Sequence, residues 1–360
     1  MHKDDLSMVG QGKRTFRRQT RRQSIAPRPE GKKMMKAAAI DRFGPPSVLA
    51  LHTFPVPKLG PREVLIALFA AGVGVWDTDI RGGWWPEGRP KFPLVLGTDG
   101  AGIVAAKGKY VRRFDVGDRV WAYEFINPKG GFYAEYVAVT SDSVGLMPKH
   151  LNLLQAGAAT VTGLTAVQGI DSHLRVRAGE TVLIFGASGA VGTLALQFAK
   201  RRGARVIATA RGDAPKRLLR KLGADKIIDP STKNAVAQVR AFAPNGLDAA
   251  LALAGGSMLE HLLVLVRPGG RVAYPNGVEP PPHARPKIKH ISYDAESGPR
   301  RFAQLSRAVS EARLQVPIAQ VCPLENAAEA HERIKNGHVL GRIVLQIRSE
   351  SGIDKESQGT

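Results

Sequence analysis

The stretch from residue 181 to residue 211 limits what this chain can fold into more than any other part of the sequence. Thr181–Phe185 is an apolar run, too short for a helix and rich in strand-forming residues, so it predicts a buried strand. Thr193–Arg202 has the periodicity of a helix, and Arg205–Thr209 is a second short apolar run. A strand, a turn, a helix and a second strand form a βαβ unit, which predicts a parallel sheet.

Three glycines at a spacing of three residues join the first strand to the helix. Glycines there allow a tight turn and let the backbone approach a pyrophosphate, whose charge favours the positive N-terminus of the helix. The spacing is G-x-x-G-x-x-G rather than the usual G-x-G-x-x-G, and a turn that binds nothing stays open as an alternative. We expect a dinucleotide to be held by Gly186, Ala187, Ser188, Gly189, Ala190, Val191 and Gly192.

The end of the second strand indicates which dinucleotide this is. A site specific for NAD places an Asp or Glu there to hold the ribose 2′-hydroxyl. This chain has Thr209, Ala210 and Arg211, with Lys216 shortly after. Cations without a carboxylate suit a 2′-phosphate, so the sequence predicts NADPH. The alternative is that Arg211 is only a solvated loop charge.

Composition sets broad limits on the class of protein. The chain has 360 residues, of which 43% are hydrophobic and 23% charged, so it is long enough for two globular domains. No apolar run has the length of a membrane span. Cys322 is the only cysteine, which excludes an internal disulfide and favours a reducing compartment. We therefore expect a cytoplasmic protein that does not associate with membranes.

The net charge of +21 raises the possibility of binding to nucleic acid. Residues 1–34 hold ten Lys or Arg against three acidic residues, which gives +7 and leaves +14 for the remainder. No zinc finger, helix-turn-helix or aromatic RNA-binding motif accompanies this charge. We favour a solvated basic surface that attracts anionic cofactors over a nucleic-acid site. Residues 1–34 have little hydrophobic content, so we expect a disordered arm.

Residues after Met35 contain many short strands separated by turn signals, which is typical of a small barrel-like domain. Helical patterning begins near Leu153, and strands alternate with helices as far as Arg271. The chain then returns to mixed character and ends in a polar tail, residues 349–360.

Together these residues resemble the medium-chain dehydrogenase/reductase superfamily, in particular its zinc-free, quinone-oxidoreductase-like branch. The resemblance covers almost everything after Met35 and depends on the order and spacing of several segments. These are MKAAAIDRFGPPSVL, LGTDGAGIV, GGFYAEYVAV, AATVTGLTA, GASGAVG and AHERIKNGHVLGRIVLQI.

The resemblance implies an α/β fold with two domains. A GroES-like β-rich barrel would comprise residues 35–155 and 290–348, and a Rossmann domain with a doubly wound parallel sheet, residues 156–289, would lie between these parts. It also implies a cofactor cleft between the domains. A homodimer would form by joining sheet edges around Val272–Gly277 and Lys287–Tyr293.

The resemblance further predicts that no metal takes part. Zinc-dependent relatives have a Cys-His pair where this chain has Trp76 and Asp77, and their Gly-His-Glu segment is replaced by Gly97-Thr98-Asp99. A metal held by Asp77, Asp99 and a distant histidine is the alternative. Zinc-free relatives reduce quinones or conjugated carbonyls. The chemistry implied is therefore hydride transfer from NADPH to such a small molecule.

Aromatic residues are candidates for the substrate pocket, because flat side chains suit a flat substrate. They are Trp76, Trp84, Trp85, Tyr123 and Phe125. The alternative is that they only pack the mouth of the barrel. Asp77 or Asp79 would donate the proton if burial raises its pKa, with water or a purely structural role as the alternatives.

A few further residues are expected near the cofactor. Thr160 and Thr165 lie in the segment that would join the domains, although either could instead serve the helix. Ala254, Gly255 and Asn276 follow predicted strands at the ends where ligands bind in open α/β sheets.

Two functions of different class follow from the sequence. The first is an NADPH-dependent reductase of quinones or α,β-unsaturated carbonyls. The second is a catalytically weak NADPH-binding protein that binds nucleic acid or another partner through its basic surface. The substitutions at Gly74 and Asp79, where quinone-reductase relatives often have Asn and Tyr, keep the second open.

Overall fold

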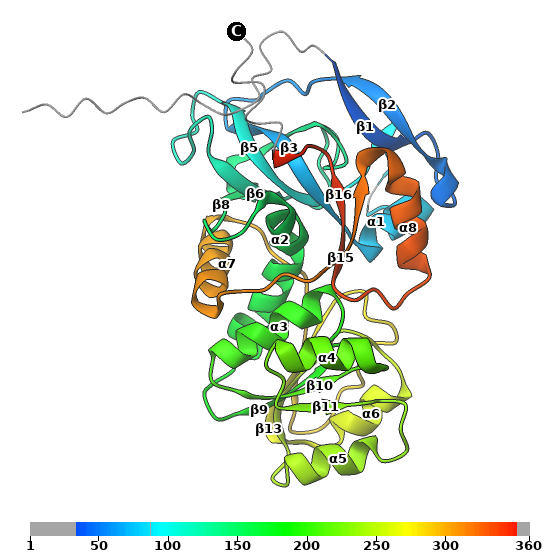
Figure 1. Ribbon diagram of the computed structural model, residues 1–360, viewed down its shortest axis with the longest axis vertical. Helices are drawn as coiled ribbons and strands as arrows, with labels where there is room; N and C mark the ends of the chain where they lie inside the picture. The colour runs from blue at the N-terminus through cyan, green and yellow to red at the C-terminus, as the bar shows by residue number, and fades with distance from the viewer. Residues whose placement is uncertain (1–33, 87, 351–360) are drawn as a thin grey trace, which may run out of the picture.

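The computed structural model describes residues 34–86 and 88–350, arranged as two domains (Figure 1). The predictions for residues 1–33 of the basic arm and for residues 351–360 of the tail lie outside the described residues. Met34, expected to end the arm, begins strand β1 and pairs with Pro55. Glu350, expected in the tail, accepts a hydrogen bond from the Leu153 backbone N–H at 2.7 Å.

The lower domain in Figure 1 contains a six-stranded parallel sheet in the order β11-β10-β9-β12-β13-β14. This is the doubly wound order, in which the chain starts in the middle and builds outward in both directions. Its strands are β9 (Thr181–Phe185), β10 (Arg205–Thr209), β11 (Lys226–Ile228), β12 (Leu247–Ala252), β13 (Val266–Pro275) and β14 (Lys289–Tyr293). Its helices are α3 (Ala190–Arg201), α4 (Asp213–Lys221), α5 (Ala235–Phe242) and α6 (Ser257–Leu263).

The upper domain is β-rich, as predicted. A seven-stranded sheet has the order β15-β16-β3-β5-β6-β8 with β7 paired to β3, and a three-stranded sheet has the order β2-β1-β4. The strands are β1 (Met34–Ile40), β2 (Leu49–Pro55), β3 (Glu63–Val73), β4 (Leu94–Val95), β5 (Asp99–Lys107), β6 (Arg119–Tyr123), β7 (Tyr136–Thr140), β8 (Val144–Leu146), β15 (Ile318–Pro323) and β16 (Arg342–Gln346). Helices α1 (Val75–Gly82) and α8 (Ala327–Lys335) belong to this domain.

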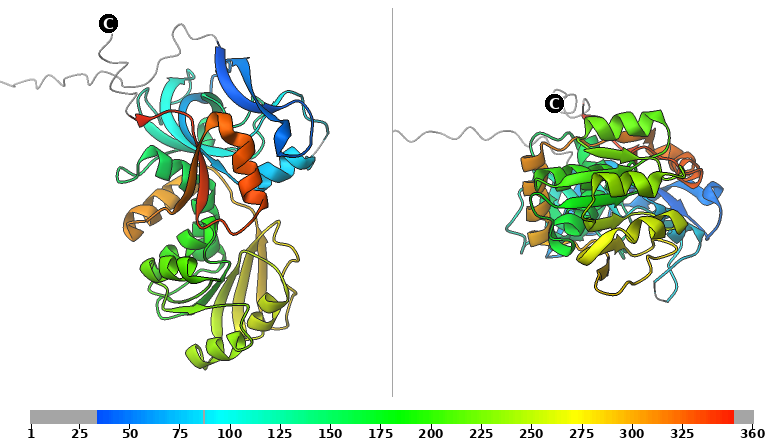
Figure 2. Two further views of the ribbon diagram at one scale, coloured as in Figure 1. Left: turned by 45° about the vertical axis from the view of Figure 1, so that its right-hand side comes forward. Right: turned by 90° about the horizontal axis from the view of Figure 1, so that it is seen from below.

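The C-terminal segment completes the barrel sheet that the N-terminal strands begin. Strand β16 pairs with β3, aligning Ile343 with Val73, so the red end of the chain lies beside its blue and cyan strands (Figure 2). The Rossmann domain is therefore inserted between two parts of the barrel domain. The fold class expected from the sequence is confirmed.

Both expected domain boundaries fall inside an element of the structure. The boundary at 289/290 cuts β14, which pairs with β13 over its whole length and so belongs to the parallel sheet. The boundary at 155/156 cuts helix α2 (Leu153–Val167), which is buried along most of its length. One continuous core joins α2, α7 (Pro299–Ala312), barrel residues such as Trp121, and sheet residues such as Val182. Helix α2 therefore connects the domains.

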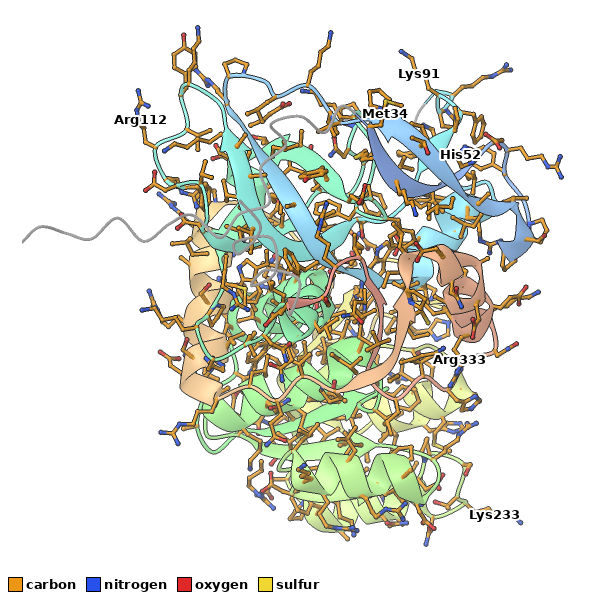
Figure 3. The ribbon with its side chains drawn as sticks, turned by 45° about the horizontal axis from the view of Figure 1, so that its top comes forward. Met34, His52, Lys91, Arg112, Lys233 and Arg333 are labelled. Atoms are coloured by element: carbon orange, nitrogen blue, oxygen red, sulfur yellow. The ribbon has the colours of Figure 1, made fainter. Side chains whose placement is uncertain are left out.

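Basic side chains project from both domains. Figure 3 shows Arg112 and Lys91 on the barrel domain and Lys233 on the Rossmann domain pointing outward. No helix in residues 34–86 and 88–350 is long and apolar enough to cross a membrane.

Candidate active site

The glycine turn between β9 and α3 is shaped by the backbone. Gly186 has φ +83°, a conformation that favours glycine. A Cβ on Gly192 would lie 2.4 Å from the carbonyl oxygen of Gly186, so only glycine lets the helix approach the strand this closely. A Cβ on Gly189 would meet only that same oxygen, at 3.6 Å. The space in front of the helix is therefore open.

The N-terminus of α3 is free to receive an anion. Its N-cap is Gly189, which supplies no side-chain cap, and its first turn has no acidic residue. The first N–H groups of a helix have no partner within the helix, and their partial positive charge attracts phosphate. The turn from Gly186 to Gly192 thus has the geometry that a pyrophosphate requires.

The end of β10 lies beside this turn. The Gly186 N–H donates to Thr209 Oγ1 at 2.9 Å, and Arg211 follows as an exposed residue with no acidic partner among the described residues. Lys216 differs from the expectation, because its ammonium pairs with Asp229 at 2.9 Å. Ser231 and Lys216 lower the pKa of Asp229 to about 2, so this carboxylate stays ionised. Arg211, two residues after β10, thus keeps its charge without an acidic partner among the described residues.

The loops after β12 and β13 reach the same edge of the sheet. Ala252 pairs with Phe185, which brings Ala254 and Gly255 near the glycine turn. The side-chain amide of Asn276 donates to Asp294 at 2.8 Å. The barrel domain also reaches this edge, since the Gly341 N–H donates to the Ser188 carbonyl at 3.2 Å.

Thr160 and Thr165 are both buried in α2, and their hydroxyls are already in use. Thr160 Oγ1 donates to the Ala156 carbonyl at 2.8 Å, and Thr165 Oγ1 donates to the Val161 carbonyl at 2.9 Å. Their donors therefore serve the helix. Only their acceptor capacity remains for a cofactor.

Asp77 lies at the start of α1 and is completely buried. Its Oδ2 accepts hydrogen bonds from the Gly74 N–H at 2.8 Å and from the Tyr133 hydroxyl at 3.1 Å. Its Oδ1 is buried without a hydrogen-bond partner among the described residues. The pKa of Asp77 is raised to about 7, mainly by burial; the Gly74 N–H opposes this rise and the charge of Asp99 adds to it. Asp77 is thus poised to hold a proton near neutral pH.

A chain of hydrogen bonds extends from Asp77 through the barrel. Tyr133 Oη lies 3.2 Å from His331 Nε2, and Arg81 Nε donates to His331 Nδ1 at 3.2 Å. Because arginine can only donate, Nδ1 must be the acceptor and Nε2 must carry the proton of a neutral imidazole. Burial and the charge of Arg81 lower the pKa of His331 to about 3, which keeps it neutral. The chain therefore donates in one direction, toward Asp77.

A second buried carboxylate is balanced by a cation. Asp99 and Arg342 form a salt bridge at 2.8 Å, and the Val161 N–H of α2 donates to the other carboxylate oxygen at 3.0 Å. Burial raises the pKa of Asp99, while Arg342 acts against this rise. Arg342 Nε and Nη1 are buried without hydrogen-bond partners among the described residues.

Trp76 is held above this ion pair. Its indole N–H donates to Thr98 Oγ1 at 2.7 Å, and the Arg342 guanidinium lies 5.1 Å from its ring. A Cβ on Gly74 would lie 2.4 Å from this ring. The indole therefore fills the space that a side chain at position 74 would need, and this fixes its orientation.

The other aromatic candidates divide into two groups. Trp84, half exposed, contacts Phe125 edge to face at 5.7 Å, and Trp85 and Phe125 line a small cavity of about 20 Å³. Tyr123 is buried on β6 in the core shared by the two domains, and Trp76 packs against that core. Asp79 is exposed on α1, and partial burial raises its pKa.

Sequence reasoning missed four residues of this arrangement, namely Arg81, Tyr133, His331 and Arg342. Arg81 and His331 are 250 positions apart, so no local pattern joins them. The available signal was weak: His331 follows the buried Ala330 on a helix otherwise rich in charge. In residues 34–86 and 88–350, no group of three His, Cys, Asp or Glu side chains could hold a metal ion.

Fold and site together define a two-domain nicotinamide-dependent oxidoreductase. Residues 60–149 match the family model for the alcohol dehydrogenase GroES-like domain, and residues 190–284 match that for zinc-binding dehydrogenase. The second matched region contains no cysteine. A mouse quinone oxidoreductase is 32% identical over 332 residues, covering 88% of this chain and 98% of its own length.

Solved structures agree with these matches. A crystal structure described as an NAD-dependent alcohol dehydrogenase has a TM-score of 0.80 at 32% identity, covering 87% of this chain and all of its own. A mycobacterial protein described as complexed with NADPH has a TM-score of 0.76 at 27% identity, with the same coverage. The chain belongs to the medium-chain dehydrogenase/reductase superfamily and is quinone oxidoreductase-like.

Proposed function

We propose that this protein reduces a quinone or an α,β-unsaturated carbonyl with NADPH and without a metal. The observation that carries the proposal is the fixed ring of Trp76. It stands where zinc-dependent relatives have a metal ligand, and it offers a flat apolar surface held by Thr98 and Arg342. A flat, electron-poor acceptor suits such a surface.

The residues of the Rossmann domain fit the cofactor. The open N-terminus of α3 would hold the pyrophosphate, and Arg211, which has no ion pair among the described residues, would pair with the 2′-phosphate. NADPH, when bound, supplies the hydride. The solved structures include one described as NAD-dependent and one described as complexed with NADPH, so similarity alone does not choose between the cofactors. Our proposal of NADPH therefore rests on Arg211.

Asp77 is the group we propose to hold the proton for the reduced acceptor. Its Oδ2 already accepts two hydrogen bonds, so Oδ1 is the atom that can carry a proton. A pKa of about 7 keeps part of this acid protonated at neutral pH. Arg81, His331 and Tyr133 are positioning residues that hold Oδ2 in place. Asp79, exposed on the same helix, is the weaker candidate.

The test is to follow oxidation of NADPH and NADH with a panel of quinones and enones, with and without a chelator. We expect turnover that resists the chelator and prefers NADPH, and that loses this preference in Arg211→Gln. The matched control is Arg220→Gln, an exposed cation on α4, which should keep the preference. Turnover that the chelator abolishes would contradict the metal-free reaction. Tight binding of NADPH without turnover of any acceptor would contradict the reductase.

We also propose that the protein is a homodimer joined at β14. Within residues 34–86 and 88–350, this strand is the last of the parallel sheet and pairs only with β13. The second stretch expected to form an edge, residues 272–277, lies mostly in β13, which has β12 on one side and β14 on the other. Light scattering of the full chain would give the mass of two copies, and the mass of one copy would contradict the proposal.

A further inference from the structure

A second hollow lies at the end of the parallel sheet opposite the glycine turn. Its volume is about 290 Å³. It is lined by Arg267 and Arg271 of β13, by Lys289 at the start of β14, and by Arg175, Arg177 and Glu180, which precede β9. Dinucleotides in open α/β sheets bind at the carboxyl ends of the strands. This hollow lies at amino ends, so it is separate from the proposed cofactor site.

Two of its arginines are fixed by carboxylates. Arg271 forms two hydrogen bonds with Glu180, at 2.9 and 2.6 Å, and a third with the Leu174 carbonyl at 2.8 Å. Arg267 Nε donates to Asp248 at 2.7 Å. These bonds build a rigid wall, because both guanidinium groups are held before any ligand arrives.

The other three cations have no acidic partner within the described residues. Arg175 makes only a weak bond to the Ser172 carbonyl, at 3.4 Å, and neither Arg177 nor Lys289 has a salt bridge. Arg175 also has φ +49°, a left-handed conformation that is unfavourable for arginine. The fold thus holds a strained arginine at the rim of a hollow that already contains like charges.

The charge of the hollow can be counted. Five cations against Glu180 and Asp248 leave three positive charges. His173, which also lines the hollow, stacks on Tyr293 at 4.5 Å between ring centres. Burial and the charge of Arg301 lower the pKa of His173, so it adds no charge at neutral pH. Like charges in one concavity repel one another and attract an anion of matching charge.

We propose that this hollow binds a compact phosphate anion of diphosphate size. A phosphate monoester carries about −1.5 to −2 charges at neutral pH, and a diphosphate carries more, which suits three unbalanced cations. Arginine forks match phosphate oxygens in pairs, and four of the five cations are arginines. The volume lies just below the range of about 300–1,000 Å³ for ligand pockets, so it suits a small anion rather than a dinucleotide.

The probe is inorganic pyrophosphate, titrated calorimetrically into the full chain saturated with NADP⁺. Saturation matters because pyrophosphate could otherwise bind at the glycine turn. We expect one pyrophosphate per chain, and binding about tenfold weaker or more in Arg175→Gln/Arg177→Gln, since charged hydrogen bonds to phosphate are the strong ones. The matched control Arg220→Gln/Lys221→Gln removes the same charge from α4 and should stay within about twofold.

Absence of pyrophosphate heat, or equal weakening in both double variants, would overturn the proposal. Arg175 and Arg177 are exposed, so the variant should keep its melting temperature; if it does not, Arg177→Gln alone is used. Failure of the proposed cofactor site is distinguishable, because a separate NADP⁺ titration would then give no heat. The affinity for pyrophosphate would still differ between the two double variants.

Discussion

The glycine turn of the Rossmann domain and the buried polar chain of the barrel domain are built in opposite ways. The turn consists of backbone: a helix N-terminus, a positive φ at Gly186 and open space at Gly189. The polar chain consists of side chains, from Arg81 through His331 and Tyr133 to Asp77, beside the Asp99–Arg342 pair. A backbone site is stable when empty, whereas a buried charge becomes destabilising when its opposite charge is removed.

Removal of one partner of the buried ion pair should have the largest effect. In Arg342→Met, Asp99 remains as an uncompensated buried carboxylate, so the free energy of unfolding should fall by about 3–5 kcal/mol. Urea denaturation measures this. Asp99→Asn/Arg342→Met, which removes both charges, should recover a large part of the loss. No recovery would show that Arg342 acts through packing on Trp76 instead of through charge.

The pH dependence of stability should separate Asp77 from His331. With a pKa of about 7, folded Asp77 retains its proton between about pH 4 and 7 while the unfolded chain has released it. The contribution of Asp77 to stability therefore falls as pH rises through this window, and Asp77→Asn should remove that contribution. His331 behaves oppositely, because between pH 6.5 and about 3 only the unfolded chain binds the proton. Stability falls there as pH decreases.

Both variants are tested by urea denaturation at a series of pH values. Between about pH 4 and 6.5 the two contributions have opposite slopes, so Asp77→Asn should leave a stability that rises with pH there, and His331→Gln should leave one that falls. Each variant serves as the control for the other. A change of slope with the same sign in both variants between about pH 4 and 6.5 would contradict the assignment of the two slopes to separate groups.

Substitutions at two glycines of the turn should affect the stability of the fold and the binding of NADPH separately. Gly192→Ala places a methyl group against the Gly186 carbonyl, which should cost roughly 1–3 kcal/mol of stability by overpacking. Gly189→Ala has room for the methyl group but fills the space in front of the helix. It should keep the melting temperature and weaken NADPH binding about tenfold, or about 1.4 kcal/mol. Unchanged NADPH affinity in Gly189→Ala would argue against this cradle.

Trp76→Phe should have a small effect on stability. It keeps an aromatic ring over Arg342 and loses the hydrogen bond to Thr98, worth about 1 kcal/mol. Thermal unfolding measures the loss, and Trp84→Phe, whose indole is half exposed, is the control. A larger loss of stability in Trp84→Phe than in Trp76→Phe would contradict the role of the Thr98 hydrogen bond in holding the ring.

The same contrast explains how much the sequence could predict. The turn, its two strands and helix α3 lie within some thirty consecutive residues, so periodicity and glycine spacing predicted them. The polar chain joins residues as far as 250 positions apart, and no short motif contains it. Asp77 was predicted as a candidate acid, but its partners and the place of β14 depend on tertiary pairing. The resemblance supplied the split barrel, which local patterns do not contain.

The pairing of the C-terminal strand β16 with the early strand β3 affects how the protein folds during its synthesis. Strand β3 is complete after residue 73, yet one of its partners, β16, begins at residue 342. A ribosome must make the whole parallel-sheet domain before that edge can be covered. During this interval residues 70–73 of β3, which pair with β16, expose unpaired N–H and C=O groups, and an exposed strand edge is a template for association with other chains. The nascent chain should therefore depend on chaperones until its last strand has left the ribosome. A chain truncated before residue 342 should be prone to aggregate.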